Sequence, residues 1–149
     1  MISKKLARKL RDAGLEWVPA EGDRFVIPDR DLEEFTFLVS EMVVEVRRIA
    51  QKRRIMFNGA VEWALDSIVQ SEAMWLPSEA QLRNRLGRAF DTLTRSDNGF
   101  TCTTVLEGER REYEAADPAD AYALALLDVL ADPDAMMRLM INDPAPDEN

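Results

Sequence analysis

The sequence contains no histidine and only one cysteine, Cys102, among its 149 residues. The absence of histidine removes the commonest general base, the commonest metal ligand and every catalytic triad that uses imidazole. One cysteine can form neither an internal disulfide nor the cysteine cluster of a zinc site. Glycine-rich phosphate loops and the nucleophile elbow of hydrolases are also missing. The sequence therefore predicts no catalytic residue, no metal site and no cofactor. An enzyme built on it would depend on carboxylate, lysine, tyrosine or hydroxyl groups alone.

Long apolar runs are missing too. No stretch approaches the ~20 apolar residues that a membrane-spanning helix needs, so we expect no membrane partner. The N-terminal sequence MISKKLARKLRDAG carries charges without the continuous apolar segment of a secretory signal. Because an internal disulfide is impossible as well, the expected location is cytoplasmic.

The net charge of -9 comes entirely from the C-terminal part of the chain. Residues 1–106 hold 16 basic and 16 acidic side chains, whereas residues 107–149 hold 12 acidic and 3 basic ones. Phosphate binding depends on basic side chains, so we expect no nucleic acid partner for this acidic chain. The acidic region either solubilises the chain or attracts a basic protein.

The first part of the chain predicts a helix followed by strands. Residues 2–13 have the apolar spacing of an amphipathic helix, with basic residues on the other face. Segments rich in aromatic and β-branched residues then predict strands at 24–27, 34–40, 42–49 and 54–57. Their alternation of apolar and polar residues suits an antiparallel sheet with one face in water.

Two helices are expected next. Asn58 can cap the first, whose apolar stripe runs from Val61 to Val69. A linker at 74–76 leads to the second, which begins with the capping box Ser78–Gln81 and continues through Leu93.

The last part of the chain predicts a hairpin and two more helices. The hairpin pairs 100–106 with 109–115, and the helices begin after Asp117 and Asp132. The stretch Ala121–Ala131 is apolar on nearly every face, which is typical of a buried helix or of a helix in a subunit interface. A homodimer is therefore one expected assembly.

Together these elements predict a single α+β domain over residues 1–141. A mainly antiparallel sheet of about five or six strands packs against helices, in the order α–β(4)–αα–ββ–αα. We expect residues 142–149 to form an acidic, disordered tail.

Trp63 and three methionines are candidate contacts with a partner or a ligand. Trp63 lies about 100° off the apolar stripe of its predicted helix, so it either belongs to the core or faces a pocket. Met136, Met137 and Met140 form either an adaptable contact surface or part of the protein's own core.

Two clusters of charged residues are also candidates. Arg47, Arg48, Arg53 and Arg54 gather at one predicted turn. They form a solvated turn, pair with the acidic C-terminal region, or join the basic N-terminal helix in an anion-binding surface. The acidic loop at 28–34 has oxygen ligands for Ca²⁺ or Mg²⁺ but lacks the glycine and spacing of an EF-hand, which favours a solvated loop.

Four segments resemble a small bacterial family of unknown function. They are GDRFVIPDRDL (22–32), MVVEV (42–46), FNGAVEWALDSI (57–68) and WLPSEAQLRNRLG (75–87). Members of this family often carry the label "pilus assembly protein", and the resemblance covers about two-thirds of the chain. It implies a single cytoplasmic bacterial domain and supplies no catalytic residue. The phosphate loop that a secretion ATPase would need is not in this sequence.

These observations favour a non-enzymatic binding or accessory protein that acts through protein contacts, with a partner still to be identified. One alternative is an acidic inhibitor or immunity-type protein that neutralises a basic effector. Another is a carboxylate-only enzyme or a small-ligand binder, which would need a pocket with several carboxylates near Trp63.

Overall fold

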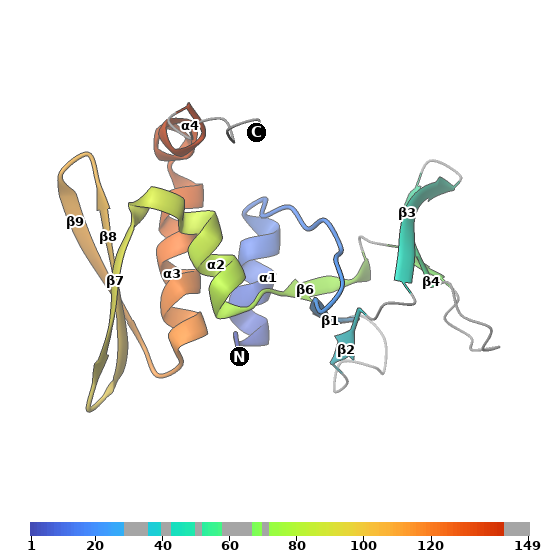
Figure 1. Cartoon of the computed structure of the whole chain (residues 1–149), viewed down its shortest axis with the longest axis horizontal. Coiled ribbons are helices and arrows are strands. Elements are labelled where there is room, and N and C mark those ends of the chain that lie inside the picture. The colour runs from blue at the N-terminus through green and yellow to red at the C-terminus, as the bar shows by residue number, and fades with distance from the viewer. Residues whose placement is uncertain (29–35, 40–42, 50–51, 58–66, 70–71, 142–149) are drawn as a thin grey trace, which may run out of the picture. The chain divides into compact units, whose positions relative to one another are not determined.

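The computed structural model describes residues 1–28, 36–39, 43–49, 52–57, 67–69 and 72–141. These residues form helices and antiparallel strands, so the predicted α+β class is confirmed (Figure 1). Contacts within the chain group it into two compact units, residues 1–15 with 78–149 and residues 16–77. The single domain over 1–141 stays a prediction, and the predicted tail lies outside the described residues. None of the described helices is long and apolar enough to cross a membrane.

The first unit places helices against one face of an antiparallel sheet of order β7-β8-β9 (Figure 1). Its strands are β7 (Phe90–Ser96), β8 (Gly99–Leu106) and β9 (Glu109–Ala115). Its helices are α1 (Lys4–Asp12), α2 (Glu79–Leu86), α3 (Pro118–Ala131) and α4 (Pro133–Ile141). Because α3 packs on β8 and β9 and also contacts the other three helices, it forms the centre of this unit.

The sequence starts α3 with a strong local signal. The Asp117 carboxylate accepts a hydrogen bond from Ala119 N at 2.8 Å, and Pro118 occupies the first turn. Its buried side chains are Ala119, Ala121, Tyr122, Ala123, Ala125, Leu126 and Val129. Much of the apolar composition that suggested a dimer interface is therefore used within the core of this unit, while Leu124, Leu127 and Leu130 are half-buried.

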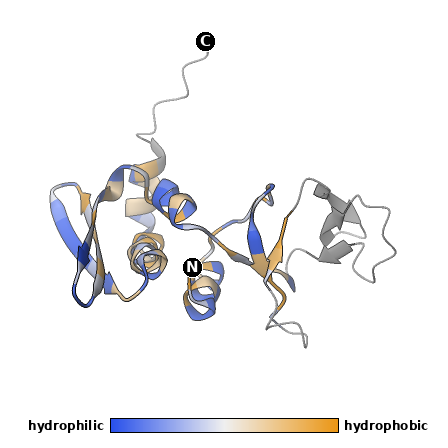
Figure 2. Cartoon of the chain, turned by 60° about the horizontal axis from the view of Figure 1, so that its bottom comes forward, coloured by the Kyte–Doolittle hydropathy of each residue, from blue (hydrophilic) through white to orange (hydrophobic). Residues whose placement is uncertain are grey.

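The predicted N-terminal helix is confirmed as α1, and polar contacts hold its start against the start of α3. Ser3 N donates to Asp120 Oδ1 at 2.7 Å, and the Met1 ammonium pairs with Asp117 at 2.9 Å. The apolar face of α1, which includes Leu6, is buried. Figure 2 shows hydrophilic and hydrophobic residues alternating along this helix, as an amphipathic helix requires.

The helix predicted to run through Leu93 is shorter than expected. The capping box at Ser78 is present, but α2 ends at Leu86, and Gly87 follows with φ +54°. A short 3-10 turn leads into β7, so Leu93 belongs to a strand. Apolar spacing alone suited both structures, and pairing with β8 selects the strand.

The second unit contains two three-stranded antiparallel sheets instead of part of one larger sheet. One has the order β2-β1-β6, with β1 at Arg24–Val26, β2 at Phe37–Leu38 and β6 at Met74–Leu76. The other has the order β3-β4-β5, with β3 at Val43–Ile49, β4 at Lys52–Phe57 and β5 at Ser67–Val69. The expected sheet of five or six strands is thus replaced by three smaller sheets among the described strands.

Two predicted elements of this unit are wrong. The segment at 67–69 was expected to end a helix but forms β5, because Ile68 pairs with Ile55 of β4. The expected linker at 74–76 is β6, which pairs with β1. Both differences come from strand partners that are distant in sequence. The helix cap expected at Asn58 lies outside the described residues.

An aromatic core holds the β2-β1-β6 sheet together. The rings of Trp17 and Trp75 are stacked at 6.4 Å, and those of Phe25 and Phe37 at 5.4 Å. Asp23 is buried beside them, and its Oδ2 accepts from Trp17 Nε1 at 2.8 Å and from a backbone amide at 3.0 Å. These bonds offset the cost of burying a carboxylate.

Candidate functional site

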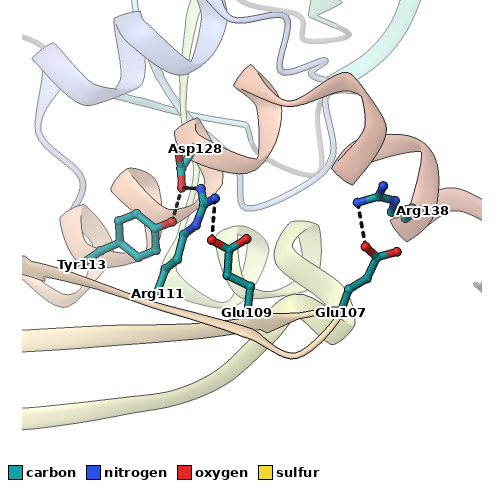
Figure 3. A network of polar contacts seen from close by, with 6 residues as sticks. All are labelled: Glu107, Glu109, Arg111, Tyr113, Asp128 and Arg138. Carbon is teal, nitrogen blue, oxygen red and sulfur yellow. Dashed lines mark hydrogen bonds and ion pairs between the residues drawn. The ribbon is translucent and has the colours of Figure 1, made fainter.

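A pocket of about 150 Å³ lies in the first unit, between the β8–β9 hairpin and the helices α3 and α4. Polar side chains dominate its lining (Figure 3). They include Glu107 of the hairpin turn, Glu109, Arg111 and Tyr113 of β9, Asp128 of α3 and Arg138 of α4. The residues at 109, 111 and 113 lie two positions apart, so the alternation of a strand puts them on one face.

The centre of the pocket is a network that joins β9 to α3. Arg111 Nη1 donates to Asp128 Oδ2 at 2.7 Å, and the Tyr113 hydroxyl donates to the same oxygen. Arg111 Nη2 also pairs with Glu109 at 3.1 Å. One carboxylate oxygen of α3 thus receives two donors from β9, which fastens the helix to the strand.

A second set of contacts joins α4 to the hairpin turn. Arg138 Nη1 pairs with Glu107 Oε2 at 2.8 Å, and Arg88 donates to the Arg138 carbonyl at 3.2 Å. Glu107 adopts φ +53°, which is uncommon for a residue other than glycine. Asp132 caps α4 by accepting from two backbone amides at 3.0 and 3.2 Å.

The environment holds Tyr113, Asp128 and Arg111 of this network in fixed charge states near neutral pH. Burial, followed by the hydrogen bond to Asp128, raises the pKa of Tyr113 to about 12. The hydrogen bond from Tyr113, followed by that from Arg111, lowers the pKa of Asp128. Hydrogen bonds to Asp128 and Glu109 raise the pKa of Arg111. General acid–base catalysis instead needs a group whose pKa lies near the working pH.

Cys102 lies on β8, the central strand of the sheet. It is the cross-strand neighbour of Tyr113 and is fully buried, and burial raises its thiol pKa to about 11. A reactive cysteine needs a lowered pKa and access to solvent. Cys102 therefore acts as a small apolar core residue.

The described residues contain no group of three or more Cys, Asp or Glu side chains placed to hold a metal ion. The carboxylates at 29–34 lie outside the part of the chain that the structure describes.

None of the candidates predicted from the sequence is among the described residues that line this pocket. Trp63 lies outside the described residues. On α4, Met136 is half-buried and Met137 is 60% exposed, and Met140 lies in the same helix. Neither Met136 nor Met137 lines the pocket.

The four predicted arginines do lie together, in the β3–β4 hairpin. Arg47 is opposite Arg54, and Arg48 is opposite Arg53. The basic helix α1 belongs to the other compact unit, so neither unit contains both basic segments.

Sequence reasoning missed the pocket itself. The alternation of Glu109, Arg111 and Tyr113 was a usable signal for one polar face of a strand. Asp128, which accepts the hydrogen bond from Arg111, lies 17 residues further along the chain, and no local sequence pattern connects the two. Comparison with protein-family models, with curated proteins and with solved structures found no match.

Proposed function

We propose that the protein is a non-enzymatic binding or accessory protein of the bacterial cytoplasm that acts through contacts with another protein. The observation that carries this proposal is that most charged side chains of the pocket are already paired with one another. Its arginines, its tyrosine and three of its carboxylates bind one another across β9, α3 and α4. These polar groups already have partners, so their main role is to fasten helices to the hairpin.

The ionisation of these groups supports the same proposal. Near neutral pH, Tyr113 keeps its proton, because burial and then the hydrogen bond to Asp128 raise its pKa, and Asp128 stays ionised, because the hydrogen bonds from Tyr113 and Arg111 lower its pKa. A general acid or base must exchange protons during turnover, so it needs a pKa near the working pH, and these shifts move both pKa values away from neutrality. The chain also contains no histidine to take this role.

The acidic-inhibitor alternative draws on the acidic residues after position 106. Within the described part, many of these side chains already have internal partners: Glu107, Glu109, Glu112, Asp117, Asp120, Asp128 and Asp132. Such partners reduce the acidic surface left for a basic effector. This alternative therefore ranks second.

The test begins with capture of partners from the native cell, using the full chain, and continues with each purified partner. We expect direct, saturable binding that persists at high salt and is unchanged by Asp128→Asn, which disturbs the pocket. Binding that disappears at high salt would favour the acidic inhibitor, because such complexes depend on charge. A small molecule that stabilises the wild type but not Asp128→Asn would overturn the proposal in favour of a ligand-binding pocket.

A further inference from the structure

The turn that joins β7 to β8 contains the dipeptide Asn98–Gly99. Asp97 and Asn98 form the turn and are both exposed, and Gly99 begins β8 opposite Ser96. Exposed turns open at a lower free energy than the core and are in direct contact with water. Asn98 therefore combines an exposed side-chain amide with a glycine as the next residue.

The backbone of this turn differs from that of the turn between β8 and β9. There, Glu107 and Gly108 adopt φ +53° and φ +83°, the positive values that fit a two-residue turn to the twist of its strands. Among the described residues other than glycine, only Glu107 has a positive φ, so Asp97 and Asn98 do not. The turn between β7 and β8 fits the strand twist less well, and we expect it to open more easily.

We propose that Asn98 is a modification site, where the side-chain amide converts spontaneously to a carboxylate through attack by the Gly99 nitrogen. Because glycine has no Cβ, no side chain shields this nitrogen once the turn opens. The nitrogen loses its proton to solvent and bonds to Asn98 Cγ, while the bond from Cγ to Nδ2 breaks and ammonia leaves. Water then opens the resulting succinimide ring, at Cγ to give aspartate or at the main-chain carbonyl carbon to give isoaspartate. One water is consumed for each ammonia released, and nothing is oxidised or reduced.

The two products have different consequences for the hairpin. Isoaspartate passes the main chain through the former side chain and so adds a methylene group before Gly99. This glycine lies close to the end of β9, since a Cβ on it would be 2.4 Å from the Ala115 carbonyl oxygen and 3.0 Å from Ala116 Cα. A longer main chain therefore disturbs either this close approach or the pairing with Ser96. Aspartate keeps the length of the main chain and adds only a negative charge.

Peptide mapping of the full chain after prolonged incubation in mildly alkaline buffer tests the proposal. Trypsin releases residues 96–110 as one peptide, in which Asn98 is the only side-chain amide. We expect its mass to change by the exchange of NH2 for OH, and a protein-isoaspartate methyltransferase to methylate part of the product. The variant Asn98→Gln is expected to stay unmodified, because glutamine would have to close a larger ring. Asn84 is an internal control, because it is exposed in α2 and precedes Arg85 instead of glycine, so we expect it to react far more slowly.

Thermal unfolding then separates the two products. The aged wild type is expected to melt at a lower temperature than the fresh protein, whereas Asn98→Asp, which mimics the aspartate product, is expected to melt close to it. An unmodified peptide in the folded chain, over a period in which the urea-unfolded chain converts fully, would overturn the proposal. Conversion of Asn84 as fast as that of Asn98 would also overturn it, because the turn and its glycine would then have no effect. An unchanged melting temperature once isoaspartate has formed would refute the predicted effect on the hairpin.

Discussion

Replacing Tyr113 with phenylalanine is the most direct test of the network that fastens β9 to α3. The substitution removes the hydroxyl that donates to Asp128 and leaves the ring in place. A hydrogen bond to a charged group contributes about 1.5–3 kcal/mol where water is excluded. The Asp128 side chain is 39% exposed, so water replaces part of the lost bond. We therefore expect the free energy of unfolding to fall by about 1 kcal/mol at neutral pH.

The same variant is expected to change the titration of Asp128. Folding lowers the pKa of this carboxyl below its ordinary value of 3.8, and the Tyr113 hydrogen bond is the largest cause. A carboxyl whose pKa is lowered by folding stabilises the fold above its unfolded pKa, and this contribution is lost as the pH falls through the folded pKa. Tyr113→Phe is therefore expected to raise the pKa of Asp128. The stability difference from the wild type is expected to shrink as the pH falls below 3.8.

The assay combines urea unfolding at neutral and acid pH with an NMR titration of the aspartate carboxyl carbons. A double-mutant cycle with Asp128→Asn isolates the coupling between the two side chains. Asp91→Asn is a matched control, because it removes an exposed ion pair with Arg110 at 3.5 Å and is expected to cost about 0.5 kcal/mol or less. An unchanged Asp128 pKa in Tyr113→Phe, or a coupling near zero, would refute the role of this hydrogen bond.

Three further predictions concern other parts of the chain. Asp23→Ala is expected to cost about 2–4 kcal/mol in urea unfolding, because the Trp17 indole and a backbone amide lose their acceptor; an equal loss in Asp23→Asn, which keeps an acceptor oxygen, would contradict this. Cys102 is fully buried with a pKa of about 11, so thiol reagents at neutral pH are expected to label it only after denaturation; rapid labelling of the native protein would disprove its inert role. Gly99→Ala is expected to lower the melting temperature, because the new Cβ would lie 2.4 Å from the Ala115 carbonyl oxygen at a φ of +137°; an unchanged melting temperature would show that this position tolerates a side chain.

Local signals predicted the first unit well where a few neighbouring residues determine the structure. The capping box at Ser78 forms both of its hydrogen bonds, at 3.2 and 2.9 Å. The hairpin around Gly108 forms with strands close to those expected. Asp117 caps the apolar helix as predicted. Each of these depends on hydrogen bonds or backbone preferences within about five residues, which are visible in the sequence.

The sequence predicted less where a segment has two compatible structures. Leu93 suits the buried stripe of a helix and also the inner face of a strand. The segment at 67–69 likewise suits both, and pairing of Ile68 with Ile55 makes it a strand. Tertiary partners override weak local preferences in such cases.

The sequence by itself determined the α+β class, the helix caps, the hairpin of the first unit and the lack of imidazole chemistry and of an internal disulfide. Only the tertiary structure decided that the described strands form three small sheets and that Tyr122, Leu126 and Val129 of α3 are buried in the first unit. It also decided that Asp128 meets Arg111 and Tyr113. The physical reason is that caps and turns depend on neighbouring residues, whereas strand pairing, burial and pocket assembly depend on residues that only folding brings together.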